Sequence, residues 1–121
     1  MPHAVAKAVG DYGERVAVRH LQSLGMQVLE RNWRCDVGEV DIVALDGDCL
    51  VVCEVKTRRS STFGSPVEAV TRRKAARLRR LAARWLAEHE LRVADLRVDV
   101  VGVVRPRRGA AEVEHLEGVD G

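Results

Sequence analysis

The sequence predicts an α/β protein, a mixed β-sheet with helices packed on it. Two long segments place apolar residues at helical spacing, and four shorter segments have the apolar, β-branched composition of strands. The order of these segments is α-β-β-β-α-β, and the chain shows no internal repeat. We therefore expect one domain over residues 1–105, followed by a tail over residues 106–121 in which residues 112–116 can form a short edge strand.

The first helix is expected over residues 4–24, although Gly10 and Gly13 weaken its first turns. Gly25 stands where glycine commonly ends a helix. Residues 26–33 then have the composition of a strand. Together these segments predict a helix that leads directly into the sheet.

The second helix is expected from Ser65 to about residue 90. Ser65 is the expected cap, Pro66 takes the first helical position, and Glu68 completes a capping box. Residues 96–104 follow as the last strand of the core. The expected inward face of the helix consists of Thr71, Ala75, Leu78, Ala82 and Trp85.

Composition excludes several classes of protein. The 121 residues are 46% hydrophobic with a net charge of +2, which is not the composition of a disordered chain. No apolar run approaches the roughly 20 residues of a membrane helix, and the N-terminus lacks the layout of a signal peptide. We therefore expect a cytoplasmic protein that does not contact a membrane.

Charge is strongly segregated along the chain. Residues 36–54 contain six acidic residues and no Lys or Arg, whereas residues 56–84 contain ten basic residues and one acidic residue. Such adjoining blocks either neutralise each other in the fold or form a cation site beside a phosphate-binding surface. Charge alone leaves both readings open.

A hairpin of residues 38–45 and 49–57 is expected around Asp46-Gly47, a strong turn signal. A two-residue loop there places Glu39 opposite Glu54, whereas a four-residue loop pairs Asp41 with Glu54. Either register puts Glu39, Asp41, Glu54 and Lys56 on one face of the sheet. A three-residue loop or a bulge would separate Asp41 from Glu54.

Three carboxylates on one face repel one another unless a cation lies between them. Oxygen ligands suit Mg²⁺ or Mn²⁺, which keep water molecules that a substrate can share. The neighbouring Lys56 can orient or help to deprotonate an attacking water. The arrangement therefore predicts a hydrolytic site for a phosphodiester.

Asp41, followed by Glu54-Val55-Lys56, resembles the PD-(D/E)xK signature of nucleases with a restriction-endonuclease-like fold. A longer set of motifs resembles the bacterial YraN family, which is similar in fold to archaeal Holliday-junction resolvases. Those motifs are Gly13-Glu14, Asn32-Trp33-Arg34, Gly38-Glu39-Val40-Asp41, Glu54-Val55-Lys56-Thr57-Arg58, the segment from Phe63 to Val70, and Arg97-Val98-Asp99-Val100.

The resemblance implies a nuclease-type fold but no established activity, and we expect a metal-dependent endonuclease that acts on DNA, with branched DNA as one candidate substrate. It implies that Asp41 and Glu54 bind the metal, that Lys56 is the catalytic lysine and that Glu14 completes the metal site. Glu39 is either a supporting carboxylate or a charge at the start of a strand. The alternatives are a binding or scaffold protein of the same fold that does not cut, and a nuclease active only with a repair or recombination partner. A homodimer is also compatible with the resemblance.

DNA contacts are expected from basic residues near this site. Arg58 and Arg59 directly follow the strand that carries Lys56, and Lys74 lies beside the buried stripe of the second helix. A stripe on that helix either binds the nucleic-acid backbone or is an ordinary solvated face. It consists of Arg73, Arg77, Arg80 and Arg84.

The remaining aromatic residues, cysteines and histidines are expected to have structural roles or no specific role. Few aromatic residues are present, which argues against binding of single strands by base stacking. The tryptophans have core size, the three cysteines are expected to fill the core, and the four histidines receive no role. Arg97 and Asp99 share a strand face and are expected at most to pair with each other.

Overall fold

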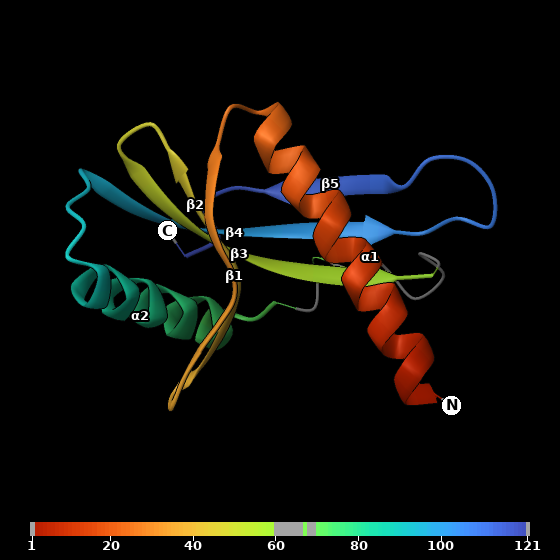
Figure 1. The fold of residues 1–121 in the computed structure, drawn as a ribbon, viewed down its shortest axis with the longest axis horizontal. Helices are drawn as coiled ribbons and strands as arrows, with labels where there is room; N and C mark the ends of the chain where they lie inside the picture. Colours follow the sequence, from red (N-terminus) through yellow and green to blue (C-terminus); the bar gives the residue numbers. More distant parts are fainter. Residues whose placement is uncertain (1, 60–66, 68–69, 121) are drawn as a thin grey trace.

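The computed structural model, which describes residues 2–59, 67 and 70–120, contains a five-stranded mixed sheet flanked by two helices (Figure 1). The predicted fold class and the predicted edge strand at residues 112–116 are confirmed. The elements are α1 (Pro2–Ser23), β1 (Gln27–Cys35), β2 (Gly38–Asp46), β3 (Cys49–Arg58), α2 (Arg72–His89), β4 (Asp95–Val104) and β5 (Glu112–Leu116).

The strands lie in the order β1-β2-β3-β4-β5. The first three form an antiparallel meander, whereas β4 pairs with β3 in parallel because the chain returns through α2. Strand β5 then pairs antiparallel with the outer edge of β4, over Val100 to Val104 only. In the part of the chain that the structure describes, no helix has the length and apolar character needed to cross a membrane.

Each helix covers its own face of the sheet. On the α1 face, the buried core is formed by Ala17, Leu21, Met26, Ile42, Ala44, Val51, Cys53, Val101 and Val103. On the α2 face, the buried core is formed by Trp33, Val40, Val43, Leu50, Val52, Leu78, Leu81, Ala82, Trp85 and Val98. Both tryptophans are therefore core residues, as the sequence predicts.

The hairpin between β2 and β3 turns one residue later than our first expectation. Asp46 pairs with Cys49, so the two-residue loop is Gly47-Asp48, and Leu45 faces Leu50. Gly47 has a φ of +59°, and Asp48 is not among the residues with positive φ, which is the pattern of a type II′ turn. This register is the one in which Asp41 falls opposite Glu54.

The second helix begins later than predicted. Helix α2 starts at Arg72, and Thr71 is its N-cap, with an extended backbone and a side chain that accepts a hydrogen bond from the Lys74 N–H at 3.2 Å. Capping by Thr71 excludes a continuous helix from Ser65. The proposed capping-box residues Ser65, Pro66 and Glu68 lie outside the described residues.

Gly13 brings α1 unusually close to β3. A Cβ atom at Gly13 would lie 1.7 Å from Oγ1, 2.8 Å from Cβ and 2.9 Å from Cγ2 of Thr57. Glycine at this position therefore allows the helix and the strand to approach closely, although it also lowers the helix propensity of α1. This contact places the next residue, Glu14, beside the start of β2 and the end of β3.

Candidate functional site

The candidate site lies where β2 and β3 separate. Their pairing ends at Ile42 and Cys53, and the next backbone group, the Val55 N–H, donates to Oδ2 of Asp41 at 2.8 Å. Because strand N–H groups point along the sheet toward the neighbouring strand, this carboxylate lies in the gap between the strands. Asp41 thus replaces a ladder carbonyl and is fixed in position.

Glu54 is the buried carboxylate of the site, and two lysines bind the same oxygen. Its Oε1 lies 3.5 Å from Nζ of Lys56, two residues further along β3, and 3.0 Å from Nζ of Lys74 on α2. Burial disfavours the charged lysine, but the interactions with Glu54, Lys56 and Asp41 together outweigh burial, so the pKa of Lys74 is raised. Sequence reasoning placed Lys74 against phosphate and did not foresee its contact with Glu54.

Glu14 approaches the site from α1. Its Oε1 is buried and has no hydrogen-bond partner among the described residues. Burial raises the pKa of Glu14, against the lowering effects of the Arg31 charge and the Asn32 side chain. An orphaned buried carboxylate oxygen is unusual in a folded protein and suits a group that binds a cation.

Negative charge accumulates around Asp41. Burial raises its pKa to about 6, and the charges of Glu54, Glu14 and Glu39 add to this, while the Val55 N–H acts in the opposite direction. These residues therefore fit a divalent cation held by carboxylate oxygens, because such an ion would offset the repulsion that raises the pKa.

Replacing Asp41 with asparagine should stabilise the metal-free protein at pH 8 by about 1–3 kcal/mol, since one pKa unit corresponds to about 1.36 kcal/mol. Asparagine still accepts from the Val55 N–H but carries no charge. Because the pKa in the folded state is raised from 3.8 to about 6, the wild type loses stability as pH rises through this interval. Urea unfolding in EDTA at pH 8 and pH 3 measures the difference, which should nearly vanish at pH 3, where the carboxyl is largely protonated in both states. An equal difference at both pH values would contradict this.

Glu39 lies at the rim of the site. Its side chain is 55% exposed and forms an ion pair with Nε of Arg34 at 2.9 Å. Its charge still contributes to the raised pKa of Asp41. The structure therefore places Glu39 near the carboxylate group but in contact with solvent and a surface arginine.

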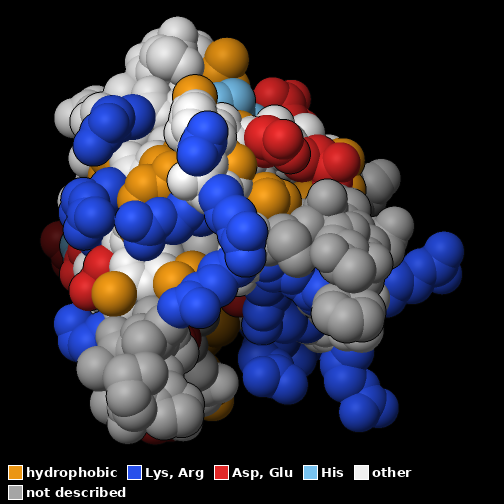
Figure 2. Space-filling model, turned by 90° about the vertical axis from the view of Figure 1, so that its right-hand side faces the viewer, with side chains coloured by type: hydrophobic (Ala, Val, Ile, Leu, Met, Phe, Trp, Pro, Cys, Tyr) orange, Lys and Arg blue, Asp and Glu red, His pale blue; other side chains and the backbone are white. Residues whose placement is uncertain are grey.

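The predicted basic residues fall into separate places. Arg58 ends β3, and Arg59 is exposed just beyond it. On α2, Arg73 and Arg77 are exposed, whereas Arg84 forms ion pairs with Asp36 and Glu88. Figure 2 shows Lys and Arg side chains spread widely over the face toward which β3 and β4 run, with acidic side chains gathered at its upper right.

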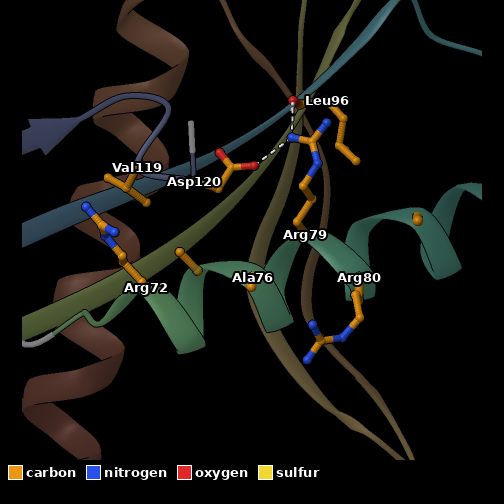
Figure 3. Close-up of a pocket in the computed structure, with 9 residues that line it drawn as sticks. Arg72, Ala76, Arg79, Arg80, Leu96, Val119 and Asp120 are labelled. Atoms are coloured by element: carbon orange, nitrogen blue, oxygen red, sulfur yellow. Dashed lines mark hydrogen bonds and ion pairs between the residues drawn. The ribbon is translucent and has the colours of Figure 1, made fainter.

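Arg80 lines a separate groove of about 800 Å³ between α2, the start of β4 and the C-terminal residues (Figure 3). Arg72 and Arg79 also line it, over a floor that includes Ala76. Nη1 of Arg79 donates to Oδ2 of Asp120 at 2.6 Å and to the Leu96 carbonyl at 3.0 Å. The arginines of α2 therefore do not form one continuous stripe of free charges.

Comparison with known proteins places the chain in a family. A family model described as "Uncharacterised protein family UPF0102" matches residues 13–103. The chain belongs to the UPF0102 family. The predicted resemblance to YraN is thereby confirmed.

Three UPF0102 relatives illustrate the similarity. The protein from Beutenbergia cavernae is 64% identical over 112 residues, which are 93% of this chain and 95% of the relative. The protein from Nocardioides sp. is 58% identical, over 96% of this chain and 94% of the relative. The protein from Streptomyces coelicolor is 59% identical, over 93% of this chain and 88% of the relative. The names of these UPF0102 proteins assign them no activity.

This UPF0102 chain contains a second polar cluster that sequence reasoning missed. Asp99 on β4 is fully buried, and its carboxylate accepts from Nε of Arg97 at 2.8 Å and from the Gly118 N–H at 3.1 Å. Nε2 of His115 lies 2.8 Å from the same carboxylate, and Nδ1 of His115 lies 3.0 Å from Nε2 of His20. The Arg97–Asp99 pair was foreseen, but the histidines were not.

The same cluster has the composition of a metal site. Ligand atoms of Asp99, His115 and Glu117 lie within 4.8 Å of one another. In this structure, however, the guanidinium of Arg97 binds both oxygens of Asp99 and supplies the positive charge. We therefore interpret the cluster as a structural connection between β4, β5, α1 and the C-terminal residues.

Proposed function

We propose that this UPF0102 protein is a metal-dependent endonuclease that hydrolyses phosphodiester bonds in DNA. The observation that carries the proposal is the buried, unpartnered Oε1 of Glu14 beside Asp41, a carboxyl whose pKa is raised by burial and by neighbouring carboxylates. Adding positive charge at this position would relieve both features.

Asp41, Glu54 and Glu14 would hold Mg²⁺ or Mn²⁺. When bound, such an ion stabilises negative charge on a phosphoryl group and lowers the pKa of water. Asp41 is kept rigid for this role by the Val55 N–H, and Glu54 by its burial. Lys56, whose ammonium group lies beside Glu54, would orient the attacking water. Glu39, at the rim of the site, would be a supporting carboxylate.

The charge around the site supports DNA as the substrate. Arg58 and Arg59 stand at the end of the strand that carries Glu54 and Lys56, and Arg73 and Arg77 project from the helix that carries Lys74. Backbone binding by several such cations makes affinity fall steeply with salt. Branched DNA is the substrate we would test first, because the resemblance of the sequence motifs to the YraN family implies a fold like that of junction resolvases.

The purified protein, incubated with four-way junction, flap, duplex and single-stranded DNA, is expected to cut at least one of them with Mg²⁺ or Mn²⁺ but not in EDTA. Asp41→Asn and Lys56→Ala should each lower the rate by about 10²-fold or more, because each removes charge stabilisation or water positioning. Arg84→Ala is the matched control, since Arg84 is already paired with Asp36 and Glu88. Cutting that survives both site substitutions would overturn the proposal.

A DNA-binding protein that does not cut is the second candidate. It is favoured by the two lysines, which already neutralise Glu54 in this structure. Salt-sensitive binding without cleavage of any of the four substrates would support this candidate, or a nuclease that requires a partner protein.

A further inference from the structure

We propose that the ammonium group of Lys74 occupies the cation position at Glu54 and is displaced when a divalent ion binds. The inference rests on the proposed metal site and adds a residue that governs its occupancy. Its basis is the contact of 3.0 Å between Nζ of Lys74 and Oε1 of Glu54, formed across the gap between α2 and β3.

The backbone of Lys74 is held firmly while its side chain remains accessible. Thr71 accepts the Lys74 N–H, and the adjacent Ala75 is buried in the core, as is Leu78 one turn later. The Lys74 side chain is 35% exposed. Lys74 can therefore withdraw its ammonium group by rotating its side chain, with no movement of α2.

The charges of the site show what Lys74 offsets. Asp41, Glu14 and Glu54 approach one another from β2, α1 and β3, and Asp41 contributes to the raised pKa of Lys74. A divalent ion on the same carboxylates would bring more charge to the oxygen that Lys74 occupies. Ion and ammonium group would compete for Oε1 of Glu54.

Lys74, rather than Lys56, is the group that can leave. Lys56 stands two residues from Glu54 on the same face of β3, so their proximity is built into the strand. Lys74 reaches Glu54 only through its side chain, from a different element. Once displaced, its ammonium group lies at the edge of the site, where a DNA phosphate would meet it.

Binding of Mn²⁺, followed by the paramagnetic resonance signal of the free ion, tests this without any measurement of cleavage. Lys74→Met should bind Mn²⁺ about fivefold more tightly than the wild type, since a partly exposed ion pair of about 1 kcal/mol is removed from competition. Lys74→Arg, which keeps the charge, should remain close to the wild type. Arg84→Met removes one charge from the same helix and should leave the affinity unchanged, because Arg84 is paired with Asp36 and Glu88.

Lys74→Gln, which removes the charge but keeps a hydrogen-bond donor, provides a second variant if Lys74→Met does not fold. Binding to the wild type that is lost in Asp41→Asn but not tightened in either Lys74 variant would overturn the role of Lys74 and leave the metal site intact. Binding that is unaffected by Asp41→Asn would overturn the metal site itself. Absence of binding to the wild type and to both Lys74 variants would overturn both ideas.

A change in the salt dependence of DNA binding provides an independent readout. With Ca²⁺ bound, Lys74→Met should reduce the slope of log K against log salt by about 0.9, the value for one lost phosphate contact in duplex DNA. In EDTA the slope should not change, because Lys74 is then bound to Glu54. An equal reduction in both conditions would contradict the displacement.

Discussion

Replacing Asp99 with alanine is expected to lower the free energy of unfolding by about 3–5 kcal/mol, the usual cost of removing one partner from a buried ion pair. Asp99 is fully buried, and its two oxygens accept from Arg97, His115 and the Gly118 N–H. Its removal leaves the guanidinium of Arg97 and the half-buried Gly118 N–H without this acceptor. Urea unfolding at pH 7 measures the loss.

Asp46→Ala provides the matched control, because Asp46 pairs with the same arginine at 3.3 Å but is 40% exposed. An exposed pair is worth about 0–1 kcal/mol, so this variant should be almost as stable as the wild type. Similar losses from both substitutions would show that burial of Asp99 adds nothing.

The contribution of Asp99 should depend on pH in a defined direction. Burial acts to raise its pKa, but hydrogen bonds from His115, Arg97 and Gly118 outweigh burial and place the pKa below its ordinary value of 3.8. The stabilisation is therefore present above pH 3.8 and is lost as pH falls through the lowered pKa. The difference between wild type and Asp99→Ala should shrink in strong acid.

Gly13→Ala is expected to destabilise the protein by about 2–3 kcal/mol, the range for overpacking. The added Cβ would lie within 3.0 Å of three atoms of Thr57, including its Cβ, so a change of the Thr57 rotamer cannot remove the clash. Helix α1 would have to shift, and with it Glu14. Thermal or urea unfolding in EDTA measures the effect, and the same variant should bind Mn²⁺ more weakly.

Gly10→Ala is the control from the same helix. No atom of the described residues lies within 4 Å of a Cβ at this position, so this variant should gain about 0.5–1 kcal/mol from helix propensity. Gly13→Ala combined with Thr57→Gly should recover most of the lost stability. If Gly13→Ala were as stable as Gly10→Ala, the close contact between helix and strand would have no energetic consequence.

The sequence predicts the fold well because its signals are local. Helical spacing and the turn at residues 46–48 mark the helices and the hairpin, and the resulting sheet is the expected one. The turn was misplaced by one residue because Asp46-Gly47 and Gly47-Asp48 both read as two-residue loops. The predicted start of the second helix is too early, because Ser65-Pro66 is a strong local signal for a helix start. In the structure, Thr71 is the N-cap.

The candidate site could be predicted in part for the same reason. Asp41, Glu54 and Lys56 lie on adjacent strands of one hairpin, so their proximity follows from strand geometry. The contact of Lys74 with Glu54 depends on how α2 docks, which no local pattern records. The Asp99 cluster needs the pairing of β5 with β4 and the return of the C-terminal residues, and His115 stands in a segment without a strong signal.

The parallel pairing of β3 with β4 has a kinetic consequence. All ten residues from Cys49 to Arg58 pair with Asp95 to Val104, so a long stretch of chain must be closed before this pairing forms. The meander of β1, β2 and β3 joins neighbours and can assemble sooner. Its acidic residues then meet while α2, with Lys74, has yet to dock, and electrostatic repulsion opposes this early stage. Ions in the surrounding solution that screen this repulsion would therefore speed folding as well as stabilise the folded protein.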